Sequence, residues 1–208
     1  MPDTGWMNIV AISVPWSAAL LAAVARSQVR AIGFIAALIS VGASALALRA
    51  ATGSELLGET LMVLFSCLAV VAMLVLPTRD CNPRTISGML FILGSTLLAY
   101  STGNLPVLLV AWILTTVPFF ITALFGSATW RPRVGLLFSS VALALAIALI
   151  AANGHPMSIN GLEGRSPGGM AVFGLLIVAV IFRKGICPAH AWVADAVEGG
   201  PLFPLLFC

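Results

Sequence analysis

Long apolar runs separated by short polar segments dominate the chain. A run of about 20 apolar residues is long enough for an α-helix to cross the roughly 30 Å hydrocarbon core of a membrane. The runs lack the alternation of polar and apolar residues that is typical of membrane β-barrel strands. The pattern therefore predicts about seven transmembrane helices, over residues 7–24, 31–48, 61–76, 86–100, 105–125, 134–152 and 170–187.

Composition agrees with a location in the lipid bilayer. Hydrophobic residues make up 61% of the 208 residues and charged residues only 8%, and the mean hydropathy is +1.12. A soluble domain usually carries about a quarter charged residues, so composition excludes a soluble enzyme. We expect an all-α integral membrane protein whose residues 1–208 form a single membrane domain.

The basic residues indicate the orientation of the chain. Most of them fall in alternate loops on one side of the membrane, and only Arg49 and Arg165 fall on the other. The larger group contains Arg26, Arg30, Arg79, Arg84, Arg131, Arg133, Arg183 and Lys184. Because basic loops stay in the cytoplasm, we expect a multi-pass protein of the cell inner (cytoplasmic) membrane with its amino terminus outside. The basic residues lie singly or in pairs, which argues against nucleic acid as a partner.

The sequence contains no recognisable catalytic or metal-binding motif. Its four cysteines form no CxxC pair, and the histidines are limited to His155 and His190, so a metal site is not expected. The sequence also lacks a phosphate-binding loop, a Ser-His-Asp order and a dinucleotide glycine fingerprint. We therefore expect no catalytic residue, no metal and no cofactor in this chain.

Charged and titratable side chains gather after the seventh apolar run. Residues 183–198 hold six of them: Arg183, Lys184, Cys187, His190, Asp195 and Glu198. Pro188 lacks a backbone N–H and would clash with the carbonyl of Lys184, so we expect the seventh helix to be interrupted near Pro188. Buried basic groups cost roughly 2.5 to 3.5 kcal/mol in a membrane and often mark an ion path. The alternative is that Arg183 and Lys184 simply end the helix at the cytoplasmic interface.

The spacing P-x-H-x-W-x-x-D-A resembles a family signature. It is formed by Pro188, His190, Trp192, Asp195 and Ala196, and it is similar to the motif of the proton-conducting antiporter-like subunits of respiratory complex I, Mrp cation antiporters and membrane-bound hydrogenases. A turn at residues 103–105 followed by Trp112 and Pro118 resembles the fifth helix of the same family.

The resemblance covers only the amino-terminal half of such a subunit and implies a role in ion transport. Family members contain inverted repeats with a discontinuous helix, so residues 188–208 are expected to form a re-entrant or truncated segment. The resemblance implies a membrane subunit related to proton or cation translocation, working with other membrane subunits in an NADH:quinone oxidoreductase-type or ion-transport complex. Any redox chemistry would belong to those partners. The candidates for a proton or ion pathway are Arg183, Lys184, His190, Asp195 and Glu198, and the family-motif structural residues are Trp112, Pro118, Pro188, Trp192 and Ala196.

Two key positions depart from the family pattern. Ile113 stands where the family carries a glutamate, and Arg183 stands where it carries a lysine. Isoleucine cannot bind a proton, and arginine does not release one in proteins. Lys184 would have to take the place of the family's lysine, but its side chain points in a direction turned by about 100° around the helix. We also expect no carboxylate within the first six spans. The alternatives are therefore a non-conducting structural or assembly subunit, or a split half of a transporter.

Overall fold

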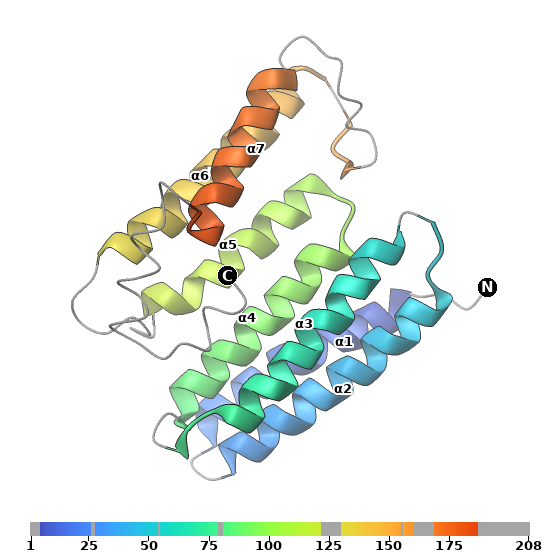
Figure 1. Cartoon of the computed structure of the whole chain (residues 1–208), viewed down its shortest axis with the longest axis vertical. Helices are drawn as coiled ribbons and strands as arrows, with labels where there is room; N and C mark the ends of the chain where they lie inside the picture. Colours follow the sequence, from blue (N-terminus) through green and yellow to red (C-terminus); the bar gives the residue numbers. More distant parts are fainter. Residues whose placement is uncertain are drawn as a thin grey trace. The chain divides into compact units, whose positions relative to one another are not determined.

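The named secondary-structure elements of the described residues are all helices (Figure 1). The structure is a computed structural model, and it describes residues 5–25, 28–53, 55–78, 81–121, 130–154, 156–159 and 169–186. Its helices are α1 (Gly5–Val24), α2 (Val29–Ala50), α3 (Glu55–Val75), α4 (Pro83–Ser101), α5 (Leu105–Ile121), α6 (Arg131–Ala152) and α7 (Gly169–Lys184). Each matches one predicted span, and the prediction of an all-α fold is confirmed.

Four of the described helices have the length and composition needed to cross a membrane. These are α1, α2 and α3, together with residues Pro132–Ala152 of α6. Helix α5 is apolar over Leu105–Phe120 but shorter. Large apolar side chains on these helices are exposed, among them Leu20, Leu74 and Leu145. Exposed apolar faces on long apolar helices are what lipid requires, and the chain is an all-α membrane protein.

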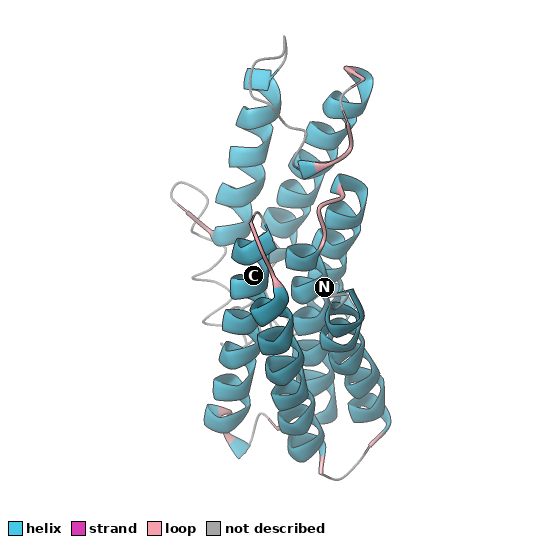
Figure 2. Ribbon diagram, turned by 90° about the vertical axis from the view of Figure 1, so that its right-hand side faces the viewer, coloured by secondary structure: helices cyan, strands magenta, loops and turns pink. Residues whose placement is uncertain are grey.

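The chain separates into two compact units, and each is described by itself. The described part of the first unit contains α1 to α4, and that of the second contains α5 to α7. In the first unit, α1 packs between α2 and α4, and α3 contacts the same two helices on the opposite side. Figure 1 shows these four helices lying side by side as a bundle, and Figure 2, coloured by secondary structure, shows only helices and loops in the described residues.

Small residues set the spacing of the helices in the first unit. A Cβ on Gly94 would lie 2.6 Å from the Trp16 ring, and a Cβ on Gly58 would lie 2.6 Å from the carbonyl oxygen of Tyr100. The indole N–H of Trp16 donates a hydrogen bond to the Ser95 hydroxyl at 3.3 Å. Glycine at these two positions allows α4 to approach α1 and α3 closely, as small residues do in membrane helix pairs.

Helix α4 begins earlier than the apolar run that predicts it. The prediction starts at residue 86, whereas the helix starts at Pro83. The side-chain oxygen of Asn82 accepts a hydrogen bond from the backbone N–H of Thr85 at 2.7 Å. Asparagine at the N-cap and proline in the first helical position stabilise a helix start, although neither extends an apolar run.

Helix α3 also begins early, and this changes the account of acidic residues. The predicted span starts at residue 61, but α3 starts at Glu55, where a negative charge is favourable at the positive end of the helix dipole. Glu59 is therefore inside the helix, and it is 6% exposed. The expectation that the first six spans contain no carboxylate is wrong.

Candidate ion-pathway site

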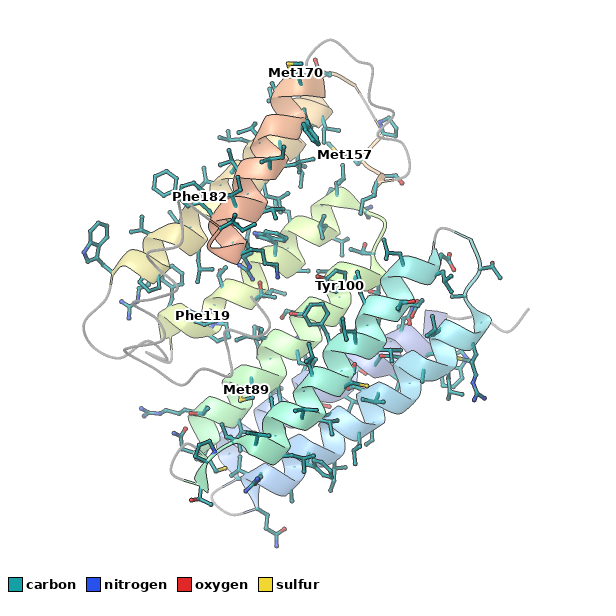
Figure 3. The ribbon with its side chains drawn as sticks, viewed as in Figure 1. Met89, Tyr100, Phe119, Met157, Met170 and Phe182 are labelled. Atoms are coloured by element: carbon teal, nitrogen blue, oxygen red, sulfur yellow. The ribbon has the colours of Figure 1, made fainter. Side chains whose placement is uncertain are left out.

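The second unit is assembled around α6, which packs against both α5 and α7. Its buried core is formed by Leu105, Ala142, Leu143, Ile147, Ile150 and Ala179. The segment after α6 returns to the start of α5: the backbone N–H of Leu105 donates to the Met157 carbonyl at 3.0 Å, and that of Ile159 donates to the Gly103 carbonyl at 2.9 Å. These bonds fix the start of α5 beside the end of α6, where Figure 3 labels Met157.

Helix α7 ends at Lys184 because of the glycine that follows. Gly185 has a φ of 58°, in the left-handed region that glycine adopts without strain. The backbone N–H of Ile186 then donates to the Ile181 carbonyl at 3.0 Å, which satisfies a carbonyl at the helix end as in a Schellman motif. The predicted end at residue 187 is corrected to Lys184. Pro188, to which the interruption was assigned, lies outside the described residues.

Arg183 is buried against α5, although it lies in the last turn of α7. Its side chain is 3% exposed, and its guanidinium donates a hydrogen bond to the Thr115 hydroxyl. The guanidinium carbon also lies 5.1 Å from the centre of the Trp112 ring, a distance at which a cation–π attraction acts. Lys184, the next residue, is exposed. In the described structure, Arg183 therefore points into the second unit and does not lie on its surface.

Two hydroxyl groups join the three helices around Arg183. The Thr115 hydroxyl accepts from Arg183 and donates to the Trp112 carbonyl at 2.7 Å. The Trp112 indole N–H donates to the Ser139 hydroxyl of α6 at 3.1 Å, and that hydroxyl donates to the Ala179 carbonyl of α7 at 2.7 Å. Each hydroxyl thus donates one bond and accepts one, so the polar atoms that link the helices are mutually satisfied.

The site presents a fixed positive charge next to neutral groups of α5. The described part of the second unit contains no aspartate or glutamate, and the groups that contact Arg183 in the bonds above are a hydroxyl and an aromatic ring. Arginine stays charged at any physiological pH. Such a site can attract an anion, repel a cation or set the field along a nearby path, but it cannot relay a proton through its own side chain.

Comparison with known proteins identifies the family. The model of the NADH:quinone oxidoreductase/Mrp antiporter transmembrane family matches residues 102–207, which include all of α5, α6 and α7. The chain belongs to this family. It is similar to NADH-quinone oxidoreductase subunit 14 of Thermus thermophilus, with 34% identity over 124 residues. That match covers 55% of this chain and 28% of the relative, so the chain spans well under two thirds of the relative's length.

The structure places part of the family motif and leaves the rest outside the described residues. Trp112 and Arg183, which the sequence resemblance assigns to the fifth and seventh helices of the family, are in contact. Pro118 is buried within α5. Ile113, at the family's glutamate position, is 43% exposed and lies on a different side of α5 from Trp112 and Thr115. The motif residues that lie outside the described part of the chain are Pro188, His190, Trp192, Asp195, Ala196 and Glu198.

Thr115 and Ser139 were not among the predicted site residues. Thr115 follows Trp112 by three positions, so the two share one face of α5. That spacing is the only signal that the sequence offers for Thr115. Nothing in the sequence connects Ser139 to this face, because its role depends on where α6 packs.

Among the described residues, no group of three or more histidine, cysteine or acidic side chains could hold a metal ion.

Proposed function

We propose that this chain is a membrane subunit related to the proton- or cation-translocating antiporter-like subunits, and that it acts within an NADH:quinone oxidoreductase-type or other ion-transport complex. The observation that carries the proposal is the buried contact of Arg183 with Trp112 and Thr115. Arg183, at the position where the family carries a lysine, is thereby held against α5, the helix that carries the family's tryptophan. The similarity to a subunit of an NADH-quinone oxidoreductase supports the same assignment.

Arg183 acts in this proposal as a fixed charge. It sets the electrostatic potential around α5 and α7 but does not take up and release protons, because guanidinium stays protonated. The groups that would move a proton or ion beside it are Lys184, which is exposed on α7, and the motif residues His190, Asp195 and Glu198. Pro118, Pro188, Trp192 and Ala196 have structural roles in this proposal.

A second candidate function is that of a non-conducting structural or assembly subunit. Two observations favour it: Ile113 has no proton-binding group, and Arg183 replaces a titratable lysine. In either case the partners are other membrane subunits of a larger complex, and the chain itself holds no redox cofactor.

The proposed location is the cell inner (cytoplasmic) membrane with the amino terminus outside. The apolar helices and the family support a membrane location. The orientation rests on the distribution of lysine and arginine, which favours one set of alternate loops.

Purification of the chain under mild conditions tests the proposal. An affinity-tagged chain extracted from its native membrane in a mild detergent is expected to co-purify with other membrane subunits in stoichiometric amounts. Flavin or iron–sulfur centres in the purified assembly would support the respiratory assignment, and cation antiporter subunits without such centres would support the ion-transport assignment. A chain that purifies alone from its native membrane would contradict the proposal.

A further inference from the structure

The first unit contains a buried polar pair that the family motif does not include. The side-chain amide of Asn8, on α1, donates a hydrogen bond to Oε1 of Glu59, on α3, at 2.6 Å. Glu59 is 6% exposed. The two residues lie near the starts of their helices, Asn8 in the first turn of α1 and Glu59 just after the first turn of α3, and these helices begin at the same end of the bundle in Figure 1. The carboxyl of Glu59 is therefore inside the bundle, close to one end of two membrane-spanning helices.

One hydrogen bond leaves two acceptor atoms of this pair without donors. Oε2 of Glu59 and Oδ1 of Asn8 are both buried, and neither receives a hydrogen bond from the described residues. A buried acceptor without a donor costs about 1 to 3 kcal/mol, and more when it is charged. Because the Glu59–Asn8 pair contains two such acceptors, we expect a hydrogen-bond donor that the bonds above do not include.

The charged groups around Glu59 do not supply that donor. Glu55 lies one turn earlier on α3, is exposed, and has the same sign of charge. At this end of the bundle, α2 carries the exposed Arg49 in its last turn. No ion pair between Glu59 and a described basic residue is present.

A single proton on Glu59 satisfies both unpaired acceptors. Protonation converts Oε2 from an acceptor into a donor, and Oδ1 of Asn8 is an acceptor in need of one. In a cyclic acid–amide pair, one hydrogen bond runs in each direction and neither acceptor is left without a donor. A metal ion would need several more oxygen ligands, typically about six for Mg²⁺ or Ca²⁺, and no cluster of ligating side chains is present among the described residues.

We propose that Glu59 is a proton-binding carboxyl whose proton is shared with the side-chain carbonyl of Asn8. It gives the α1–α4 unit a group that can bind and release a proton inside the helix bundle, a chemistry that Arg183 cannot provide. The proposal does not depend on the proposed function, because it rests on atoms of the first unit alone. It predicts that the pair is protonated at neutral pH and that proton release breaks the bond from Glu59 to Asn8.

Infrared spectroscopy of the full chain tests the proposal. In liposomes at neutral pH, we expect a carbonyl-stretch band of a protonated carboxylic acid that shifts in D₂O. Glu59→Gln is expected to remove this band and to retain the fold, because the glutamine amide can donate to Asn8 as the acid does. Glu55→Gln, which alters an exposed acid on the same helix, is the matched control and should leave the band unchanged.

A second variant tests the proposal if Glu59→Gln does not fold. Asn8→Leu keeps the size of the side chain but removes the acceptor, so the acid band is expected to shift in frequency. The proposal is overturned if the unmodified chain shows no such band at neutral pH, or if the band persists in folded Glu59→Gln. It is also overturned if Glu59→Gln does not fold and Asn8→Leu leaves the band at its original frequency.

Discussion

Ser139 is the residue whose loss should reveal most clearly how the second unit is held together. Its hydroxyl accepts from the Trp112 indole and donates to the Ala179 carbonyl, so the Ser139→Ala change removes both polar links of α6 to α5 and α7. Hydrogen bonds between membrane helices contribute about 0.6 kcal/mol on average and up to about 1.7 kcal/mol. Removal of both bonds also leaves a buried indole N–H without an acceptor, so we expect a loss of about 1 to 2 kcal/mol.

The neighbouring serine provides the control. Among the described residues, the Ser140 hydroxyl bonds only to the Leu136 carbonyl of its own helix, at 3.0 Å. Ser140→Ala should therefore change stability by no more than about 0.5 kcal/mol. Equilibrium unfolding of the purified chain in mixed micelles, followed by circular dichroism, measures both variants under the same conditions.

A double-mutant cycle separates the Ser139–Trp112 bond from other effects. Trp112→Phe removes the indole donor, and its effect should combine with that of Ser139→Ala less than additively, with a coupling of at least about 0.5 kcal/mol. If Ser139→Ala costs no more than Ser140→Ala, or if the two sites are additive, the hydroxyl does not join the helices as described.

Three further predictions concern the first unit and the orientation of the chain. Gly58→Ala should destabilise the chain by about 1 to 3 kcal/mol, because the new methyl would lie 2.6 Å from the Tyr100 carbonyl oxygen, whereas Gly42→Ala, with nothing within 4 Å, should be neutral or stabilising in the same unfolding assay. Arg30→Gln should cost about 0.5 to 1.5 kcal/mol, because Arg30 donates to two carbonyls in the last turn of α3, while Arg49→Gln should be close to neutral; equal losses would contradict this role. A reporter fused at the amino terminus should be found outside the cytoplasm, and a cytoplasmic signal would reverse the assigned topology.

The apolar pattern was sufficient to predict the existence and order of the helices but not where they start. Hydrophobic runs reveal the part of a helix that meets lipid or the core, and they miss polar first turns. Helix α3 shows the reason: the predicted span 61–76 leaves out Glu55 and Glu59, whereas the first stabilises the helix start and the second is buried beside Asn8. The partner of Glu59 is 51 residues away in sequence, so no local pattern predicts the contact.

The candidate site could be predicted only in part. The motif spacing pointed to Trp112 and Arg183, and the two residues are in contact. The alternative that Arg183 merely ends a helix at the membrane surface was open from the sequence, because Arg183 and Lys184 look equivalent there. The direction of each side chain separates them: one is buried and the other exposed. The contacts of Thr115 and Ser139 depend on how α5, α6 and α7 pack together. Residue spacing within one apolar run gives no information about that packing.

Proton flux through the chain alone tests most directly the claim that Arg183 is a fixed charge and not a proton switch. Proteoliposomes that contain only this protein should show the same proton leak as empty vesicles under an imposed potential. Ile113→Glu should not restore a flux, because Arg183 cannot exchange a proton with the new carboxylate; Ile113→Glu combined with Arg183→Lys supplies both titratable groups of the family pattern and is the matched test for a dormant pathway. A saturable proton current from the unmodified chain would contradict the prediction that this chain alone does not conduct, and persistence of that current in Lys184, His190, Asp195 and Glu198 variants would show that the groups assigned to proton movement beside Arg183 do not carry it.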